Sequence, residues 1–167
     1  MIMQVQTALT EDTVDEVVAK HELRTGDVLG VLEELQRRHP QRYLPRQTLE
    51  LVARKLGVSA SRVFSVATFY SFFNLEPQGE HTLMVCRGTA CHTRGSKTLL
   101  DRIRSKVELI QSADGETYTT PDHKLTLRTV ACFGQCALAP VVGLDEKIYS
   151  YMTEVELNKL LNSLAKK

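Results

Sequence analysis

The sequence predicts an α+β protein with a helical first part and a second part that mixes strands and helices. Up to about residue 72, apolar residues recur at the spacing of amphipathic helices. From Glu80 onward the pattern changes, and two segments show the continuous or alternating apolar residues of strands. We therefore expect a helical bundle domain over residues 1–78 and an α+β domain over residues 79–167.

Four short helices are expected in the first part, each bounded by capping residues or by proline and glycine. Their boundary signals are Thr10 to about His21, Thr25 or Gly26 to Pro40, Pro45 to Gly57, and a fourth helix capped by Ser59. The apolar stripes of such short helices can be buried only against one another or against a partner. The first part should therefore form a small four-helix bundle.

An aromatic segment follows the last of these helices. Residues Thr68 to Leu75 hold four of the ten aromatic residues of the chain, and Pro77 and Gly79 come next. Proline and glycine interrupt regular structure. We expect a packed hinge at this point, with the aromatic side chains in the core.

The second part should contain a strand, a helix, three further strands and a final helix. The expected segments are a strand at 81–85, a loop from Arg87 to Ala90, a helix from Ser96 to about Val107, a loop from Gln111 to Asp122, a strand at 124–130, a hairpin of 141–144 with 147–151, and a helix opened by Thr153 and Glu156. In a capping box such as Thr153 with Glu156, each side chain binds the backbone N–H of the other residue.

All four cysteines lie in two pairs, Cys86 with Cys91 and Cys132 with Cys136, and each pair follows an expected strand. The N-terminal residues are too polar and acidic for a signal peptide, so we expect a soluble, cytoplasmic protein. Disulfides are disfavoured in the reducing cytosol. Clustered thiols in such a protein indicate metal ligands or redox groups.

The charge distribution excludes some classes of partner. Up to Gln78 the chain has nine basic and ten acidic residues, and after it twelve and ten, for a net charge of +1. Neither part is the basic arm of a nucleic-acid-binding protein. No apolar run reaches the roughly 18 residues that span a bilayer. We therefore expect neither a nucleic-acid partner nor direct insertion into a membrane.

The spacing of the cysteines favours a binuclear cluster. Thiolates bind zinc, a single iron or an iron–sulfur cluster. Four residues separate the first pair and three the second, whereas a zinc knuckle commonly has about two. A [2Fe-2S] cluster takes two thiolates on each iron. A zinc-stabilised interaction module remains the alternative, and His92 is not expected to be a ligand because four cysteines are available.

Three motifs together resemble a known family. They are Cys86-Arg-Gly-Thr-Ala-Cys91-His92, the run Val66-Ala-Thr-Phe-Tyr-Ser-Phe-Phe-Asn-Leu75, and Cys132-Phe-Gly-Gln-Cys136 followed by Ala139-Pro140. The chain resembles the 24 kDa [2Fe-2S] subunit of NADH dehydrogenase complex I, of NAD-linked and electron-bifurcating hydrogenases, and of NAD-dependent formate dehydrogenases. The resemblance covers nearly the whole chain.

The resemblance implies an N-terminal helical domain and a C-terminal thioredoxin-like domain that holds one [2Fe-2S] cluster on Cys86, Cys91, Cys132 and Cys136. It also implies that the chain is an electron carrier in a hetero-oligomeric oxidoreductase complex. Where such a complex is bound to a membrane, the chain would lie in its peripheral arm. FMN and NAD(H) would lie on a partner flavin- and NAD-binding subunit, next to further iron–sulfur or catalytic subunits. No catalytic residue is expected on this chain, and its sequence carries no dinucleotide-binding motif.

Two other classes of redox protein fit the sequence less well. A free-standing thioredoxin-like ferredoxin would need no helical docking domain, and a dithiol oxidoreductase would need a C-x-x-C pair that the chain lacks.

Arg87, Arg94 and Lys97 flank the first cysteine pair. We hypothesise that they partly compensate the charge of the reduced cluster. The alternative is that they are solvated or bind a partner.

Overall fold

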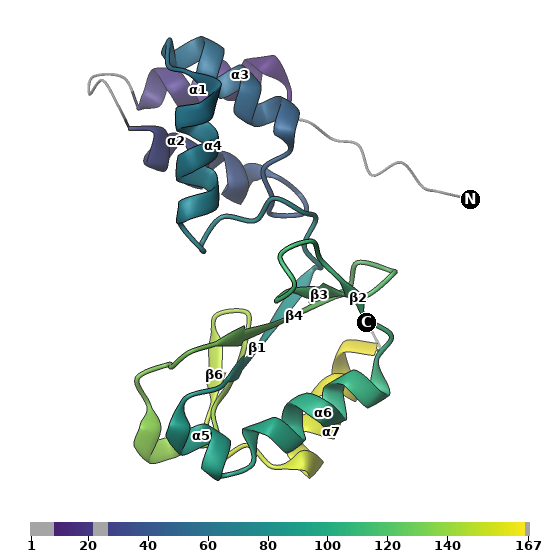
Figure 1. Cartoon of the computed structure of the whole chain (residues 1–167). Coiled ribbons are helices and arrows are strands. Elements are labelled where there is room, and N and C mark those ends of the chain that lie inside the picture. Colours follow the sequence, from purple (N-terminus) through teal and green to yellow (C-terminus); the bar gives the residue numbers. More distant parts are fainter. Residues whose placement is uncertain (1–8, 22–26, 166–167) are drawn as a thin grey trace. The chain divides into compact units, whose positions relative to one another are not determined.

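The computed structural model describes residues 9–21 and 27–165. Within these ranges the chain forms seven α-helices, one 3-10 helix and six strands (Figure 1). Contacts divide the chain into two compact units, Met1–Pro77 and Gln78–Lys167. The assignment of residues 1–78 and 79–167 as domains stays a prediction. No helix in the described ranges is both long and apolar enough to cross a membrane.

Four helices make up the described part of the first unit. They are α1 (Glu11–Lys20), α2 (Val28–Arg38), α3 (Arg46–Leu56) and α4 (Ala60–Phe69). Thr10 caps α1 by accepting from the Thr13 N–H, and Ser59 caps α4 by accepting from the Arg62 N–H, as the sequence predicts. Gly57 ends α3 in the left-handed conformation, with φ 64°.

The start of the second helix differs from the expectation. Asp27 caps α2, because its carboxylate accepts from the Gly30 N–H at 3.0 Å. The predicted start at Thr25 or Gly26 lies outside the described residues. Pro45 is the N-cap residue of α3 and lies just before its first residue, Arg46, whereas the sequence predicts Pro45 as the first residue of the helix.

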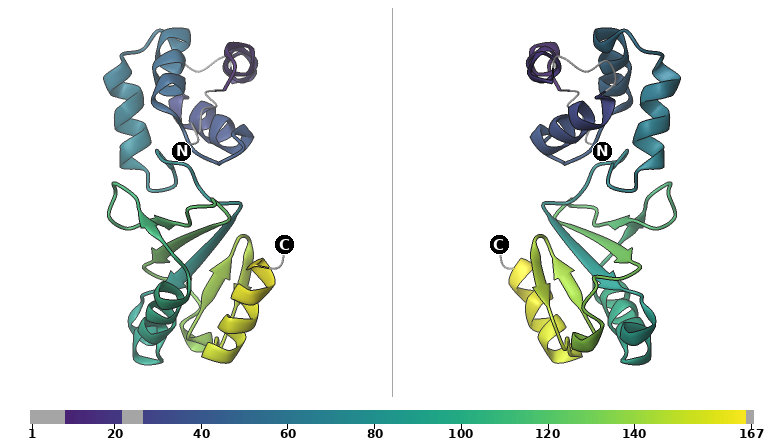
Figure 2. Two further views of the ribbon diagram at one scale, coloured as in Figure 1. Left: turned by 90° about the vertical axis from the view of Figure 1, so that its right-hand side faces the viewer. Right: turned by 90° about the vertical axis from the view of Figure 1, so that its left-hand side faces the viewer.

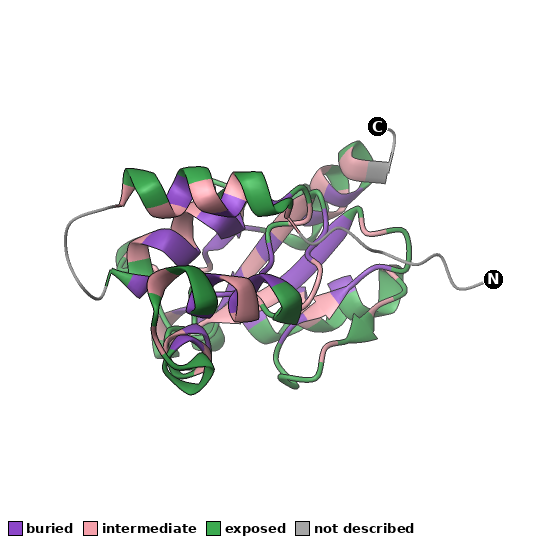
Figure 3. Ribbon diagram, turned by 90° about the horizontal axis from the view of Figure 1, so that it is seen from above, coloured by how far each residue is buried: buried purple, intermediate pink, exposed green. Residues whose placement is uncertain are grey.

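Figure 2 shows the four helices of this unit grouped together. They share one hydrophobic core. It is formed by residues from every helix, among them Val14, Val17, Leu32, Leu35, Leu49, Val52, Val63 and Ala67. Buried residues lie on the inner sides of the helices and exposed residues on the outer sides (Figure 3). Shared burial explains why helices this short are stable. The four-helix bundle as a topology stays a prediction.

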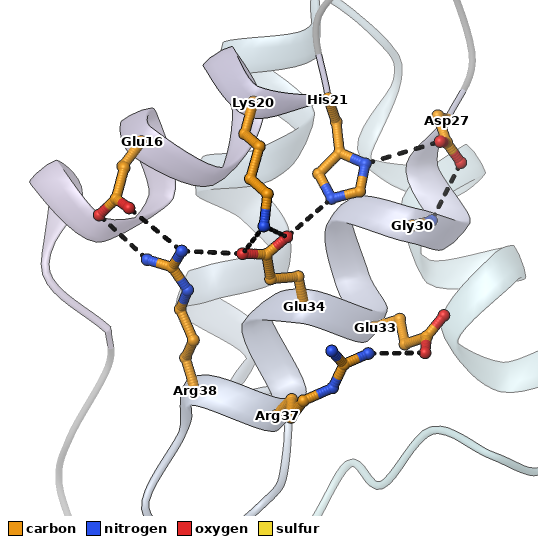
Figure 4. Close-up of polar contacts among 9 residues, drawn as sticks. All are labelled: Glu16, Lys20, His21, Asp27, Gly30, Glu33, Glu34, Arg37 and Arg38. Carbon is orange, nitrogen blue, oxygen red and sulfur yellow. Dashed lines mark hydrogen bonds and ion pairs between the residues drawn. The ribbon is translucent and has the colours of Figure 1, made fainter.

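A network of charges joins the first two helices, with Glu34 of α2 at its centre (Figure 4). Its carboxylate binds Lys20 at 2.9 Å, His21 at 3.0 Å and Arg38 at 2.8 Å. Arg38 also binds Glu16 of α1 at 3.0 Å. The hydrogen bond from Lys20 comes first among the causes that lower the pKa of Glu34 to about 2. The carboxylate therefore stays charged well into acid.

The aromatic segment after α4 is not packed as predicted. Phe73 is buried, but the side chains of Phe69, Tyr70 and Phe72 are 79%, 45% and 59% exposed. The four rings form a contiguous series of edge-to-face contacts. Buried Gln36 holds the turn in place, since it donates to the Phe72 carbonyl and accepts from the Asn74 N–H. The expectation of a fully packed hinge was wrong for three of the four rings.

The second unit is built on a six-stranded mixed sheet in the order β2-β3-β4-β1-β5-β6. Its strands are β1 (His81–Cys86), β2 (Ile110–Gln111), β3 (Tyr118–Thr119), β4 (Leu125–Val130), β5 (Val142–Leu144) and β6 (Lys147–Tyr149). Central strands β1 and β4 run parallel, and every other pair is antiparallel. The segment predicted as a loop, Gln111 to Asp122, contains β3 and the end of β2. Strands of two residues are too short to show a period.

The two longest helices of this unit are α6 (Ser96–Lys106) and α7 (Glu154–Ala165), and both pack on the sheet. Leu83 of β1 packs in one core with Leu99 of α6 and Leu157 of α7. Thr153 and Glu156 form the predicted capping box, with reciprocal N–H bonds of 3.1 and 3.3 Å. The helices thereby fix the sheet from which the cysteines emerge.

Candidate metal centre

The pairing of β1 with β4 brings the two cysteine segments together. The strands are parallel and in register, with Cys86 opposite Val130, so both end at the same edge of the sheet. The Arg87 N–H donates to the Val130 carbonyl at 2.8 Å and continues this pairing past Cys86. Cys132 follows Val130 by two residues. Residues that are 46 positions apart in the sequence are therefore neighbours.

The first cysteine segment is partly helical. Its short helix, α5 (Thr89–Thr93), follows the end of β1 after two intervening residues (Figure 1). The sequence predicts a loop from Arg87 to Ala90, and this expectation was wrong from Thr89 onward, because five residues are too few to show helical periodicity. The helix turns Cys91 inward, where its side chain is buried, and leaves His92 exposed.

The second cysteine segment is an irregular loop with a short 3-10 helix, η1 (Cys136–Leu138). Gly134 has φ 78°, and its N–H points at the Cys132 sulfur at 3.2 Å. A backbone N–H in this position stabilises a thiolate. Cys132 and Cys136 are both exposed.

A glycine lets the two segments approach closely. A Cβ atom at Gly88 would lie 2.9 Å from the Ala131 carbonyl oxygen and 3.8 Å from the Cβ of Cys132. The shorter distance is below van der Waals contact, so only glycine fits without displacing the second loop. Gly88 is therefore part of the geometry that brings the cysteine pairs together.

One cysteine pair already has the spacing of ligands on one metal. The sulfurs of Cys132 and Cys136 lie 3.7 Å apart. Two thiolates on a tetrahedral metal with bonds of about 2.3 Å are separated by about 3.8 Å. The donor set therefore fits a thiolate-bound metal on this pair.

The other pair is buried. Cys86 and Cys91 are each 2% exposed and pack in a small cluster with Ala139 and Val141. The centre thus has a half that is shielded from water and a half, at Cys132 and Cys136, that faces solvent. One pair is thus accessible from solvent, and the other is protected from it.

The thiols affect one another electrostatically. Burial raises the pKa of the Cys86 thiol, but hydrogen bonds from the Gly88 backbone and from Cys91 outweigh it, so this pKa lies below its usual value. Burial and the neighbouring Cys86 raise the pKa of Cys91. The hydrogen-bonded neighbour Cys132 raises the pKa of Cys136. The titration of each of these three thiols is therefore linked to that of a neighbouring cysteine.

In the described part of the chain, no three His, Cys, Asp or Glu side chains converge as the ligands of a single ion do. A [2Fe-2S] cluster makes a different demand, because its four thiolates bind two to each iron. Two neighbouring pairs suit this arrangement.

The three basic residues near the first pair have different surroundings. Arg87 and Lys97 line an open groove of about 470 Å³ together with His92 and Arg104. Arg94 instead reaches the second loop, where it donates to the carbonyls of Ala137 and Ala139. The sequence places Arg94 near the first cysteine pair but does not reveal its contact with a loop more than 40 residues away.

A family model settles the relationship of this chain to known proteins. The model of the thioredoxin-like [2Fe-2S] ferredoxins matches residues 14–165, which is most of the sequence. The chain belongs to the thioredoxin-like [2Fe-2S] ferredoxin family. Membership of this family confirms the resemblance found in the sequence and the thioredoxin-like character of the fold, and implies a [2Fe-2S] cluster.

Relatives of this thioredoxin-like [2Fe-2S] ferredoxin include components of two kinds of complex. The NADP-reducing hydrogenase subunit HndA of Solidesulfovibrio fructosivorans is 34% identical over 119 residues, which cover 71% of this chain and 67% of the relative. An NADH-quinone oxidoreductase subunit of Rickettsia typhi is 35% identical over 134 residues, which cover 80% of this chain and 75% of the relative.

The fold also resembles part of a solved enzyme, the NAD⁺-reducing [NiFe]-hydrogenase in the air-oxidized state. The TM-score is 0.68 at 15% identity, over 85% of this ferredoxin and 23% of that chain. At this identity the likeness concerns the fold alone. This chain therefore spans about a quarter of the length of the solved one.

Proposed function

We propose that this chain is the [2Fe-2S] electron-transfer subunit of an NAD(P)H-oxidising flavoprotein complex, with Cys86, Cys91, Cys132 and Cys136 as the four ligands. The observation that carries the proposal is the meeting of two cysteine pairs at one edge of the sheet, in a chain of this family. The 3.7 Å spacing of Cys132 and Cys136 supports the assignment of the ligands.

The cluster would supply reversible one-electron chemistry, and the protein residues would set its environment. The Gly134 N–H stabilises negative charge on Cys132, from 3.2 Å away. The apolar cluster around Cys86 and Cys91 excludes water from the other pair. Amide donors and nearby cations raise the potential of a cluster, and burial without them lowers it.

The relatives support a place in a multi-subunit oxidoreductase. Their names are those of a hydrogenase subunit and of an NADH-quinone oxidoreductase subunit. In this role the chain exchanges single electrons with the flavin of a partner and has no substrate site of its own. FMN and NAD(H) would be bound by that partner, and the complex would be cytoplasmic or form a peripheral arm at a membrane.

The first unit supplies a surface suited to a protein partner. Three rings, those of Phe69, Tyr70 and Phe72, are exposed, and the turn that carries them is fixed by Gln36. Aromatic residues are enriched in the buried centres of protein interfaces. These rings favour a complex subunit with a helical docking domain at residues 1–78 over a free-standing ferredoxin. The cluster-binding domain would be residues 79–167.

Anaerobic purification followed by metal and sulfide analysis tests the cluster. We expect about two irons and two sulfides per chain, with a visible absorption spectrum that bleaches on reduction. Zinc without iron would overturn the proposal and support a zinc-stabilised interaction module, which is colourless and redox-silent.

Co-expression with the flavin subunit of the same organism tests the role in a complex. We expect a stable assembly in which NADH reduces the cluster through the flavin. A cluster-loaded chain that forms no assembly and accepts no electrons from the flavin subunit would instead indicate a free-standing ferredoxin.

A further inference from the structure

Arg94 connects the two cysteine segments. It follows Cys91 by three residues and ends α5, where its own N–H donates to the Cys91 carbonyl at 3.2 Å. Its guanidinium Nη1 lies 3.3 Å from the Ala137 carbonyl oxygen and 3.4 Å from that of Ala139. One side chain of the first segment therefore binds the second segment at two points, directly after Cys136.

Along residues 137–140, carbonyls that accept from Arg94 alternate with carbonyls that accept from backbone N–H groups. The Tyr151 N–H donates to Leu138, and the Met152 N–H donates to Pro140, each at 2.9 Å. The oxygens of Leu138 and Pro140 are thus bound by a neighbouring segment, and those of Ala137 and Ala139 by Arg94. All four carbonyls from 137 to 140 have partners, and Arg94 provides half of these contacts.

The contact also affects the buried cysteines. Ala139 is 2% exposed and packs in one cluster with Cys86 and Cys91. Because Arg94 holds the Ala139 carbonyl, it holds the residue that covers these two thiols. Loss of the contact would release the loop that carries Cys136 and open the cover over the first pair.

We propose that Arg94 is a positioning residue: its two hydrogen bonds to the second cysteine loop, here called the clasp, hold this loop against the first segment and keep Cys136 and Ala139 in place before the metal arrives. Its relevance to the cluster rests on the proposed function. The positive charge of Arg94 does not by itself explain this role. Arg87 carries the same charge nearby, but among the hydrogen bonds of the described residues none joins its side chain to the second loop. Lysine is a poor substitute for such a contact, because its ammonium is a strongly hydrated point charge on a flexible stem.

Thiol labelling of the metal-free protein tests the clasp without any cluster. With wild-type chain and a water-soluble disulfide reagent, Cys132 and Cys136 should react fast and Cys86 and Cys91 slowly, as resolved by peptide mass spectrometry. In Arg94→Ala we expect the two buried thiols to react about tenfold faster, which is the factor of one charge-assisted hydrogen bond. Thermal unfolding of each variant shows that the fold is intact.

Two further variants separate contact from charge. Arg87→Ala removes a nearby charge and should leave the labelling of Cys86 and Cys91 unchanged. Arg94→Lys keeps the charge and should label almost as fast as Arg94→Ala. Equal labelling rates in Arg94→Ala, Arg87→Ala and wild type would overturn the clasp.

The loaded protein provides an independent readout. We expect Arg94→Ala to lose iron to a chelator about tenfold faster than wild type, and its midpoint potential to fall because a positive charge is lost. Arg94→Lys should restore the potential but not the retention of iron. Restoration of both by lysine would overturn the clasp in favour of charge. A wild-type chain that binds no iron would contradict the proposed function. The labelling of the metal-free protein would still show whether Arg94 holds the second loop in place.

Discussion

Gly88 and Ala131 lie so close that a Cβ on the glycine would be 2.9 Å from the Ala131 carbonyl oxygen. The two residues belong to different cysteine segments and are 43 positions apart in the sequence. Their contact sets how near the pairs can come, because one segment cannot move toward the other past this point. Position 88 is therefore sensitive to substitution by any residue with a side chain.

We predict that Gly88→Ala displaces the second loop and weakens retention of the cluster. The added methyl group meets a backbone oxygen, which cannot rotate away as a flexible side chain would. Overpacking of this kind costs typically about 1–3 kcal/mol. Iron content after gel filtration should fall to less than about half, with a lower melting temperature. Thr89→Ala, at an exposed neighbouring position, is the matched control, and iron content no lower in Gly88→Ala than in this control would contradict the prediction.

We predict that Cys136→Ser abolishes the normal cluster, since serine is a much harder ligand than a thiolate. The change is on an exposed side chain, so the helices and sheet should remain folded. The visible absorption band and the electron paramagnetic resonance signal of the reduced protein are the measurements.

The control for this experiment is His92→Ala. His92 is exposed and is not proposed as a ligand, so its variant should keep iron content and spectrum at wild-type values. Loss of the cluster in His92→Ala, or its full retention in Cys136→Ser, would refute the ligand assignment.

We predict that Glu34 stabilises the first unit at neutral pH and ceases to do so in acid. Its pKa falls to about 2 in the folded protein, from 4.5. Since the folded pKa is the lower one, the contribution is fully present above about pH 4.5 and is lost as the pH falls toward 2. Solvent screening limits the contribution to roughly 1 kcal/mol.

Urea unfolding of Glu34→Gln at pH 7 and at pH 3 measures this contribution. The variant should be less stable than wild type at pH 7, and the difference should shrink at pH 3. Glu33→Gln is the control, because the pair that Glu33 forms with Arg37 is exposed and lies within one helix. A difference in stability between Glu34→Gln and wild type that does not change with pH would contradict the prediction.

We predict that the exposed rings serve association and the buried ring serves stability. Phe69→Ser with Phe72→Ser should weaken binding to the co-expressed flavin subunit at least about tenfold, as loss of central aromatic contacts does, and leave the melting temperature within a few degrees. Phe73→Ala removes a ring that is 6% exposed and should destabilise the chain by about 3 kcal/mol. Unchanged binding by the double variant in titration calorimetry would remove these rings from the interface.

Several elements could be predicted from the sequence because their signals are local. Capping by Thr10 and Ser59, and the capping box of Thr153 with Glu156, depend on residues three positions apart, and all three are present. The short strand β3 and the short helix α5 escaped prediction, since neither is long enough to show a period. The exposure of Phe69 was also missed, because its apolar character is the same whether it packs inside or faces a partner.

The sequence by itself determined the family, the cysteine pairs and the strands that carry them, since these depend on residue types and on spacing along the chain. Tertiary structure decided what crosses between the two cysteine segments. It placed Gly88 against Ala131 and Arg94 on the Ala137 and Ala139 carbonyls. The physical reason is the parallel pairing of β1 with β4: it sets distances between residues that are more than 40 positions apart, and no local pattern contains such distances.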